Sequence, residues 1–367
     1  MARLLVTGGA GFIGANFVHQ RLRSEEDDRL VVLDALTYAG NRSSLAGAEE
    51  HSEFSFVHGD IGDVDLVCDL LKSESIDTIV HFAAESHVDR SITGPGLFVE
   101  TNIVGTHALL TAARSCWLLD QRATDSHRFH HVSTDEVYGS LSPTDPAFSE
   151  TTAFAPNSPY AASKAASDHL VRAYHKTYGL NTCITNCSNN YGPFQFPEKL
   201  IPLMLVNVLH SRPLPVYGDG QNIRDWLYVD DHCRAINLAL ATGKAGRTYN
   251  VGGENEIDNL TLVQTLCDLM DDRFANDSAL GERFPDAAPV KGMRSRDLIR
   301  FVDDRPGHDR RYAIDPSRIR GELGFRLEYD FASGIASTID WYLDNEAWWR
   351  RILDGTYRAD LSADGGG

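Results

Sequence analysis

Tyr160 and Lys164 stand four residues apart in the run S-P-Y-A-A-S-K. Residues at this spacing share one face of a helix, about 6 Å apart along its axis, and Pro159 suits the first turn of that helix. A lysine ammonium beside a phenol favours the phenolate, so the pair predicts a tyrosine base whose pKa is lowered from about 10 toward neutrality. A Y-x-x-x-K pair also occurs as two surface residues, so its weight depends on the fold around it.

Two adjacent carboxylates form a second candidate constellation, S-T-D-E, at residues Ser133 to Glu136. They follow a run typical of a strand, and paired carboxyl groups are suited to acid–base chemistry. Neighbouring side chains on a strand point to opposite faces of the sheet. Both acids therefore serve one site only if the backbone turns here; otherwise one is functional and the other is solvated.

A glycine-rich turn, T-G-G-A-G-F-I-G, places Gly8, Gly11 and Gly14 between an apolar run and a helical pattern. Glycines permit a tight turn and close approach to a pyrophosphate, and the following helix points its first amides at the phosphates. Asp34 ends the next apolar run, where a carboxylate can accept hydrogen bonds from the adenosine ribose. This favours NAD over NADP. Asp60 is expected at the adenine side, or as the cap of the helix after it.

These groups need a scaffold, and short apolar runs alternating with helical patterns supply one. The candidate strands are 4–7, 30–33, 54–58, 78–81, 129–133 and 182–185, with Tyr249–Val251 returning later to the same sheet. The pattern predicts an α/β fold: a doubly wound parallel (Rossmann) sheet with a smaller mixed α/β lobe. Ligands of such sheets bind beyond the carboxyl ends of the strands.

The predicted dinucleotide-binding domain covers 1–186, with returning segments near 220–251 and 316–345. The ligand-binding lobe would comprise 187–219 and 252–315. The polar stretch Asp271–Pro289 is expected to be a loop-rich excursion, and 358–367 a disordered tail.

The composition limits which kinds of binding partner and which cellular compartment are expected. The net charge of -18 argues against nucleic acid and membrane surfaces, so an anionic ligand would need a local basic pocket. The six cysteines have no zinc-binding spacing, which predicts no metal site and buried thiols in a reduced compartment. No apolar run approaches the roughly 18 residues of a membrane span, and a cytoplasmic protein is expected.

From Arg3 to about Tyr342 the chain resembles the dTDP-glucose 4,6-dehydratase family. Besides the glycine turn and S-T-D-E-V-Y-G at 133–139, several long motifs carry the resemblance. They are L-T-Y-A-G-N at 36–41, A-A-E-S-H-V-D-R-S-I at 83–92, T-N-C-S-N-N-Y-G-P-F-Q-F-P-E-K-L at 185–200, N-I-R-D-W-L-Y-V-D-D at 222–231 and D-R-P-G-H-D-R-R-Y at 304–312.

The resemblance implies a lyase that oxidises C4 of dTDP-glucose with bound NAD, eliminates water across C5 and C6, and returns the hydride to C6. Tyr160 would deprotonate the sugar 4-hydroxyl, which Thr134 also binds, with Lys164 beside it. Glu136 would remove the C5 proton, and a protonated Asp135 would donate to the departing C6 hydroxyl.

The family pattern also assigns binding residues. For NAD these are Gly8, Gly11, Phe12, Ile13, Gly14, Asp34, Leu36, Thr37, Asp60, Ile61, Ala83, Ala84, Ser86, Thr101, Ser133, Tyr160, Lys164 and Asn190. For the sugar nucleotide they are Ser86, Thr134, Asn189, Lys199, Leu200, Val216, Tyr217, Arg224, Asn259, Arg305 and His308. The resemblance further implies a homodimer formed through helices around Thr101–Cys116 and Pro159–Tyr178.

Two other functions remain open. A sugar-nucleotide 4-epimerase shares the fold, NAD, the tyrosine and the lysine, but it has no elimination step and does not need Asp135 and Glu136. A regulator that senses dinucleotide without catalysis would leave Tyr160 and Lys164 unexplained.

Overall fold

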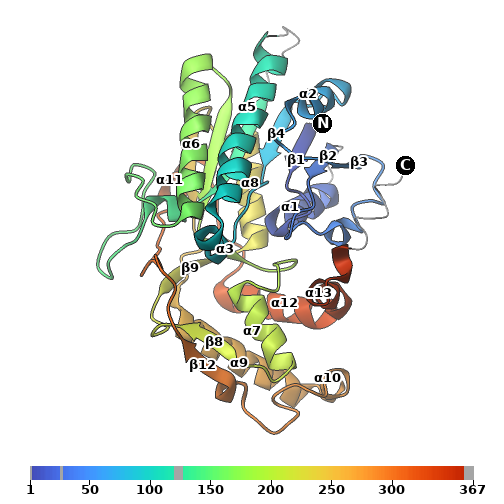
Figure 1. The fold of residues 1–367 in the computed structure, drawn as a ribbon, viewed down its shortest axis with the longest axis vertical. Helices are drawn as coiled ribbons and strands as arrows, with labels where there is room; N and C mark the ends of the chain where they lie inside the picture. Colours follow the sequence, from blue (N-terminus) through green and yellow to red (C-terminus); the bar gives the residue numbers. More distant parts are fainter. Residues whose placement is uncertain (1, 25–27, 120–126, 359–367) are drawn as a thin grey trace.

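A seven-stranded parallel sheet forms the larger lobe of the computed structural model, which describes residues 2–24, 28–119 and 127–358 (Figure 1). Its strand order is β10-β6-β5-β4-β1-β2-β3. The strands are β1 (Arg3–Thr7), β2 (Arg29–Asp34), β3 (Phe54–His58), β4 (Thr78–His81), β5 (Arg128–Thr134), β6 (Thr182–Cys187) and β10 (Arg247–Val251). Every expected strand is present, and β10 pairs with β6 in parallel, as the sequence predicts.

Helices cover both faces of this sheet. The helices of the chain are α1 (Phe12–Arg23), α2 (Val64–Ser73), α3 (Val88–Thr93), α4 (Pro95–Phe98), α5 (Thr106–Arg114), α6 (Pro159–Tyr178), α7 (Leu200–Leu209), α8 (Val229–Thr242), α9 (Asn259–Asn276), α10 (Ser278–Arg283), α11 (Ser317–Leu323), α12 (Phe331–Asp344) and α13 (Glu346–Leu353). One apolar cluster joins α2, α5 and α6 to the sheet, and a second joins α1 and α8 to its other face. The doubly wound Rossmann fold is confirmed.

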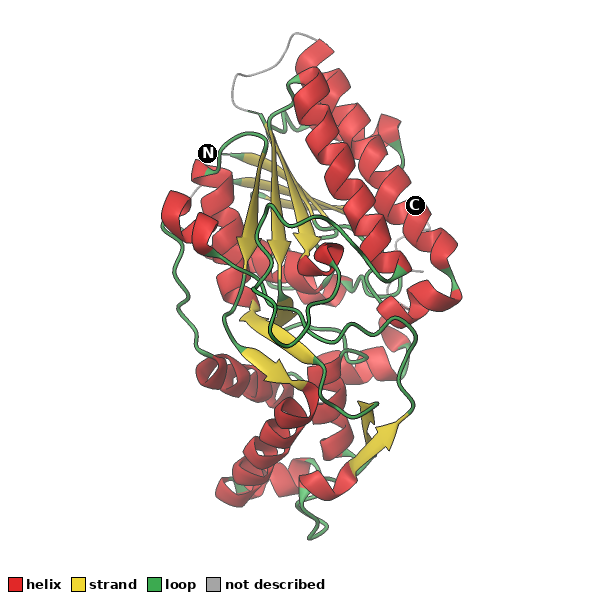
Figure 2. Ribbon diagram, turned by 90° about the vertical axis from the view of Figure 1, so that its left-hand side faces the viewer, coloured by secondary structure: helices red, strands yellow, loops and turns green. Residues whose placement is uncertain are grey.

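The smaller lobe lies beyond the carboxyl ends of the parallel strands, whose arrowheads point toward it (Figure 2). It contains two small sheets, built from β7 (Asn189–Tyr191), β9 (Ile223–Tyr228) and β11 (Glu256–Asp258), and from β8 (Leu214–Tyr217) and β12 (Ile299–Val302). Its apolar core packs α7, α9, α12 and α13 together through residues such as Met204, Leu266, Ile339 and Trp349. This lobe can therefore hold the part of a ligand that extends away from the sheet.

The expected loop over Asp271–Pro289 is wrong. Helix α9 continues to Asn276 and α10 follows, while Leu280 and Phe284 are buried in the lobe's core. The stretch reads as polar because these helices lie at the surface and bury only a few side chains.

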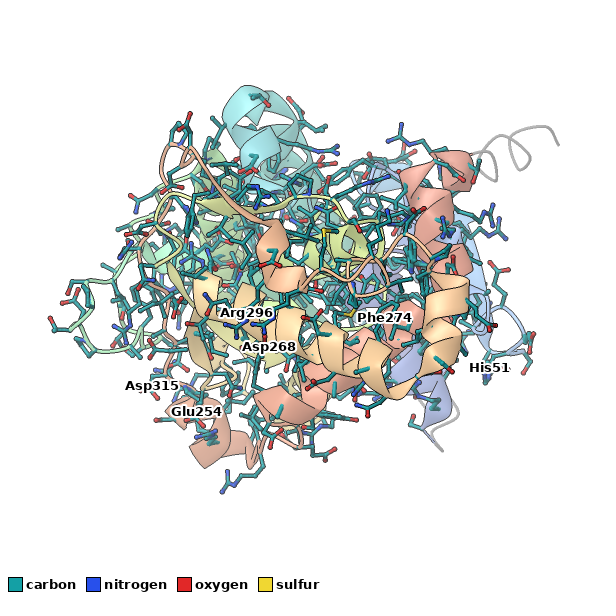
Figure 3. All side chains as sticks on the ribbon, turned by 90° about the horizontal axis from the view of Figure 1, so that it is seen from below. His51, Glu254, Asp268, Phe274, Arg296 and Asp315 are labelled. Carbon is teal, nitrogen blue, oxygen red and sulfur yellow. The ribbon has the colours of Figure 1, made fainter. Side chains whose placement is uncertain are left out.

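A 3₁₀ helix, Ser295–Leu298, is held against α9 by an ion pair in which Arg296 Nε donates to Asp268 at 2.6 Å (Figure 3). The chain therefore returns along α9 after the excursion and packs against it.

The segment expected to return at 316–345 divides between the lobes. Ile319 of α11 packs with β10 of the large sheet, whereas Ile335 and Ile339 of α12 belong to the core of the small lobe. Arg358 ends a 3₁₀ turn, Thr356–Arg358, and the rest of the expected disordered tail lies outside the described residues. Within the described ranges, none of the helices is long and apolar enough to cross a membrane.

Candidate active site

A cavity of about 320 Å³ opens at the carboxyl ends of β1, β2, β4, β5 and β6. It brings together most of the expected residues from distant parts of the chain. Those that line it are Gly8, Gly11, Phe12, Ile13, Gly14, Asp34, Thr37, Asp60, Ile61, Ala83, Ala84, Ser86, Thr101, Ser133, Thr134, Asp135, Glu136, Tyr160, Lys164, Asn189, Asn190 and Lys199.

The glycine turn forms a cradle that a larger residue would fill. Gly8 has a φ of +71°, and a Cβ there would lie 2.5 Å from the backbone nitrogen of Ala83. A Cβ on Gly14 would lie 2.3 Å from the carbonyl oxygen of Gly8. Helix α1 begins behind this turn with Gly11 as its N-cap and no side-chain cap, so its first amides face the cavity without a protein anion. The site fits a pyrophosphate.

Asp34 ends β2 inside the cavity and is fixed by the backbone. Its two carboxylate oxygens accept hydrogen bonds from the amides of Ala10, at 2.9 Å, and Leu36, at 2.8 Å. Burial raises the pKa of Asp34, and these amides oppose the shift. Leu36 itself, with φ +50°, is buried and does not line the cavity, contrary to expectation; its contribution is the amide that orients Asp34.

Asp60 also lines the cavity, and its Oδ1 accepts a hydrogen bond from the amide of Gly62 at 2.6 Å. The cap of α2 is Asp63, which accepts from the amide of Leu66 at 3.0 Å. Asp63, and not Asp60, therefore caps helix α2.

The backbone turns where the two adjacent acids stand. Strand β5 ends at Thr134, and a 3₁₀ helix, Asp135–Tyr138, begins at the next residue. The Thr134 hydroxyl accepts a hydrogen bond from the amide of Glu136 at 3.3 Å, which caps this helix. Both carboxyl groups consequently line one cavity.

Their surroundings raise the two pKa values to different degrees. Burial, and then the negative charges of Glu136 and Asp225, raise the pKa of Asp135 well above its usual value. Burial also raises the pKa of Glu136, but the cationic side chains of Arg224, Arg305 and Lys199 oppose that shift. The cations thus favour the ionised form of Glu136, whereas the neighbouring negative charges favour the protonated form of Asp135, which is the arrangement of a base and an acid.

Helix α6 presents Tyr160 and Lys164 as expected. It starts with Ser158 as N-cap, which accepts from the amide of Ala161 at 3.0 Å, and Pro159 occupies its first position. The ammonium of Lys164 donates to the carbonyl oxygen of Val132, in β5, at 2.9 Å.

The expected lowering of the Tyr160 pKa is wrong for the chain by itself. Burial raises that pKa well above the usual value, and the negative charge of Glu136 adds to the rise. The Thr134 hydroxyl opposes it. The phenol therefore needs more positive charge near it than the position of Lys164 supplies.

The remaining expected sugar-nucleotide residues do not line this cavity. They are Leu200, Val216, Tyr217, Arg224, Asn259, Arg305 and His308. Some still contribute to a basic region, because Arg224 and Arg305 lower the pKa of Glu136. Arg224 is buried, donates to the carbonyl oxygen of Asp309 at 3.0 Å and stacks 4.3 Å above the Tyr312 ring.

Arg305 donates to Asp89 at 2.8 Å, which ties the 304–312 segment to α3. His308 contacts Asp304 at 2.6 Å, while Lys199 donates to the carbonyl oxygen of Ser86 at 3.1 Å. These cations come from separate segments, and together they face the side of the site where Glu136 lies.

Several cavity residues were not among those expected, notably Tyr38, Cys187, Gln195 and Phe196. All four lie inside the L-T-Y-A-G-N and T-N-C-S-N-N-Y-G-P-F-Q-F motifs, so the motifs themselves were the available signal.

Tyr38 is also held by the C-terminal part of the described chain. The hydroxyl of Tyr357 donates to the carbonyl oxygen of Tyr38 at 2.7 Å. The Phe196 ring lies between them, with centroids 5.8 Å from Tyr38 and 6.1 Å from Tyr357. Arg90 stacks 3.9 Å from the Tyr38 ring. We call these four side chains the cofactor-loop clamp.

Known proteins are similar to this chain over most of its length. A family model described as GDP-mannose 4,6 dehydratase matches residues 5–338. A dTDP-glucose 4,6-dehydratase from Xanthomonas campestris is 55% identical over 98% of both chains. The chain belongs to the dTDP-glucose 4,6-dehydratase family.

Solved structures agree with this membership. The crystal structure of the dTDP-glucose 4,6-dehydratase DesIV from Streptomyces venezuelae, determined with NAD bound, matches with a TM-score of 0.84 and 47% identity. The match covers 95% of this chain and 99% of that one. A UDP-glucose 4-epimerase from Thermus thermophilus in complex with NAD matches with a TM-score of 0.77 at 28% identity, over 93% and 98% of the two chains. The chain is therefore more similar in sequence to these dehydratases than to this epimerase.

Proposed function

We propose that this chain is a dTDP-glucose 4,6-dehydratase that converts dTDP-glucose to dTDP-4-keto-6-deoxyglucose and water. The observation that carries the proposal is the pair Asp135 and Glu136, which line the cavity together with Tyr160. An epimerase oxidises and re-reduces one carbon and has no use for a second acid–base pair. A non-catalytic sensor has no use for any of the three groups.

NAD is the cofactor, bound with its pyrophosphate at the glycine turn and its adenosine ribose at Asp34. The cradle at Gly8 and Gly14 and the uncapped start of α1 support this orientation. NAD would accept the hydrogen of C4 with its electron pair and later return it to C6. Its positively charged ring would also supply the field that the phenol of Tyr160 needs.

The protein groups then divide the proton transfers. Tyr160, as phenolate, takes the proton of the sugar 4-hydroxyl while Thr134 donates a hydrogen bond to the same oxygen. The C4 ketone acidifies the neighbouring C5 hydrogen, which Glu136 removes as general base. Asp135 donates its proton to the C6 hydroxyl, so the C6–O bond breaks and water leaves. Glu136 returns a proton to C5 when C6 is reduced.

The diphosphate of the substrate would lie among Lys199, Arg224 and Arg305. Arginine suits this task through its planar fork of donors, and lysine as a point charge. The overall charge of -18 repels an anionic ligand, so these cations supply the local attraction that the acidic chain otherwise lacks. Asn189 and Ser86, at the cavity wall, are placed for polar contacts along the same path.

We also propose a homodimer that buries α5 and α6. These helices lie side by side at one end of the molecule (Figure 1). Val104, just before α5, is 48% exposed, and Tyr178, at the end of α6, is 43% exposed. A cytoplasmic location is proposed because six free cysteines suit a reduced compartment.

The decisive experiment is mass spectrometry of dTDP-glucose after incubation with the purified protein without added NAD. The expected product is lighter than the substrate by one water, with no free reduced cofactor. A product of unchanged mass but epimerised at C4 would establish the epimerase instead. Tight NAD binding without turnover of dTDP-glucose, UDP-glucose or GDP-mannose would establish the sensor.

A further inference from the structure

Asp168 is a buried carboxylate that none of the proton transfers above uses. It lies one helical turn beyond Lys164, as Lys164 lies one turn beyond Tyr160, so α6 aligns the three groups on one face. Its side chain is 3% exposed. A buried carboxylate is costly unless something nearby compensates its charge.

Two side chains contact Asp168. Nε2 of His131, in β5, lies 3.3 Å from Oδ1 of Asp168, and the same nitrogen lies 3.5 Å from Nζ of Lys164. Nδ2 of Asn186, in β6, donates to Oδ2 of Asp168 at 3.0 Å and to the carbonyl oxygen of Thr134 at 3.1 Å. Asn186 thus connects Asp168 to the backbone that carries Asp135, and the His131 ring lies close to both Asp168 and Lys164.

Lys164 is the positive charge with the largest influence on this carboxylate. Burial lowers the pKa of Lys164, and the negative charge of Asp168 is the largest influence that raises it again. Burial in turn raises the pKa of Asp168, and Lys164 is the largest influence that lowers it. Each group therefore favours the charged form of the other.

The other titratable groups around the pair come from every element packed against it. They are His131 on β5, His81 on β4, Cys187 on β6, Tyr138 after β5 and His169 on α6. Burial lowers the pKa values of His81 and His131 well below their usual value, so both are neutral at pH 7. Burial also raises the pKa values of Cys187 and Tyr138, so both are neutral as well. Asp168 is then the anion that faces the lysine.

We propose that Asp168 is a positioning residue for catalysis, whose negative charge, one helical turn beyond Lys164, keeps that lysine charged and fixed against Val132. The inference rests on the proposed function, because it assigns Lys164 the task of supporting the tyrosine base. Asp168 itself touches neither substrate nor cofactor. Without its negative charge the buried lysine would lose its proton more readily, and the phenol of Tyr160 would ionise only at higher pH.

The test compares Asp168→Asn with Asp168→Glu, measuring kcat, KM and the pH profile of kcat/KM with dTDP-glucose. Asp168→Asn is expected to move the acidic limb upward by about one pH unit, which lowers the rate on that limb about tenfold with little change in KM. Asp168→Glu should restore most of the wild-type profile. An unchanged profile in Asp168→Asn, with a lower Tm, would make Asp168 structural only and overturn the proposal.

Asp231 provides the matched control. It is another fully buried aspartate, and it does not line the cavity. Its carboxylate accepts hydrogen bonds from the backbone amides of Glu328 and Tyr329. Asp231→Asn is expected to lower the Tm without moving the pH profile; a similar shift in this variant would overturn the assignment to Asp168.

A second variant serves if Asp168→Asn does not fold. Asp168→Ser also removes the carboxylate and introduces a smaller side chain. It should shift the acidic limb in the same direction, and an unmoved limb would contradict the role of the Asp168 charge. Wild-type protein that forms no dehydrated product would refute the proposed function instead, so the two failures are distinguishable.

Discussion

Asp135 and Glu136 are adjacent in the chain, yet both carboxyl groups line one cavity. The reason is that β5 ends at Thr134 and the two acids are the first residues of a 3₁₀ helix. In an extended strand one of them would have pointed away. The turn also concentrates negative charge, since Glu136 and Asp225 both raise the pKa of Asp135. Catalytic geometry is therefore obtained at a cost in electrostatic free energy.

That cost predicts a pH-dependent gain in stability for Asp135→Asn. The folded-state pKa of Asp135 is raised from the ordinary value of 3.8, so the unfolded chain releases this proton first as pH rises. The free energy of unfolding therefore falls as pH increases above about 4, by about 1.4 kcal/mol for each unit of raised pKa. Asp135→Asn should match wild type near pH 4 and exceed its Tm at pH 7.

Thermal denaturation across this pH range checks the prediction. The control is Asp145→Asn, because hydrogen bonds from Ser142 lower the pKa of this exposed carboxyl. Asp145→Asn should not gain stability at pH 7, and an equal gain in both variants would count against the electrostatic explanation.

Tyr160→Phe is expected to reduce turnover by at least about 10³-fold, because it removes the phenol oxygen that takes the proton of the 4-hydroxyl. NAD content after purification, measured by chromatography of the released nucleotide, should stay at the wild-type level. Substantial turnover in this variant would remove Tyr160 from the role of base.

Glu136→Gln should still oxidise C4 but stall before water is lost, because the amide cannot accept the C5 proton. Absorbance at 340 nm should then rise on addition of dTDP-glucose and remain high, whereas wild type returns to its baseline. Normal dehydration by this variant would exclude Glu136 as the base.

Tyr357→Phe should weaken the cofactor-loop clamp by removing the 2.7 Å hydrogen bond to Tyr38. A single hydrogen bond is worth about 1 kcal/mol, so NAD should dissociate about fivefold faster. The rate is measured by trapping released NAD after dilution. Tyr329→Phe, outside the cavity lining, is the control and should leave the rate unchanged.

Phe284→Ala should lower the free energy of unfolding by about 3–5 kcal/mol, because the ring is buried in the core of the small lobe. By contrast, Arg296→Ala breaks an exposed ion pair with Asp268 and should change the free energy of unfolding far less. Chemical denaturation of both variants measures the difference. Equal, small effects would mean that the 271–289 stretch does not pack as described.

The sequence predicted the large sheet well because its signals are local. Apolar runs such as 30–33 and 78–81 carry β-branched residues bounded by polar ones, and the glycine turn marks the first crossover. The same local reasoning failed for 271–289, where Leu280 and Phe284 are too few large apolar residues in a polar stretch to signal a packed helix.

In the site, residue identity was predictable but electrostatics were not. Spacing placed Tyr160 and Lys164 on one helical face, yet the partner of Lys164 is the carbonyl oxygen of Val132, contributed by a neighbouring strand. The raised pKa of Tyr160 likewise comes from burial and from Glu136, which only the folded chain brings near. Contacts between residues that are far apart in the chain cannot be predicted from the spacing of residues in the sequence.

The cofactor-loop clamp has a consequence for the order of synthesis. Tyr38 emerges early from the ribosome, but the hydroxyl that fastens it belongs to Tyr357, 319 positions later. Strand β10, which completes the edge of the large sheet, also arrives after most of that sheet has been made. A nascent chain can thus expose its glycine turn before the clamp has formed, and the contribution of Tyr357 to holding NAD would come only at the end of synthesis.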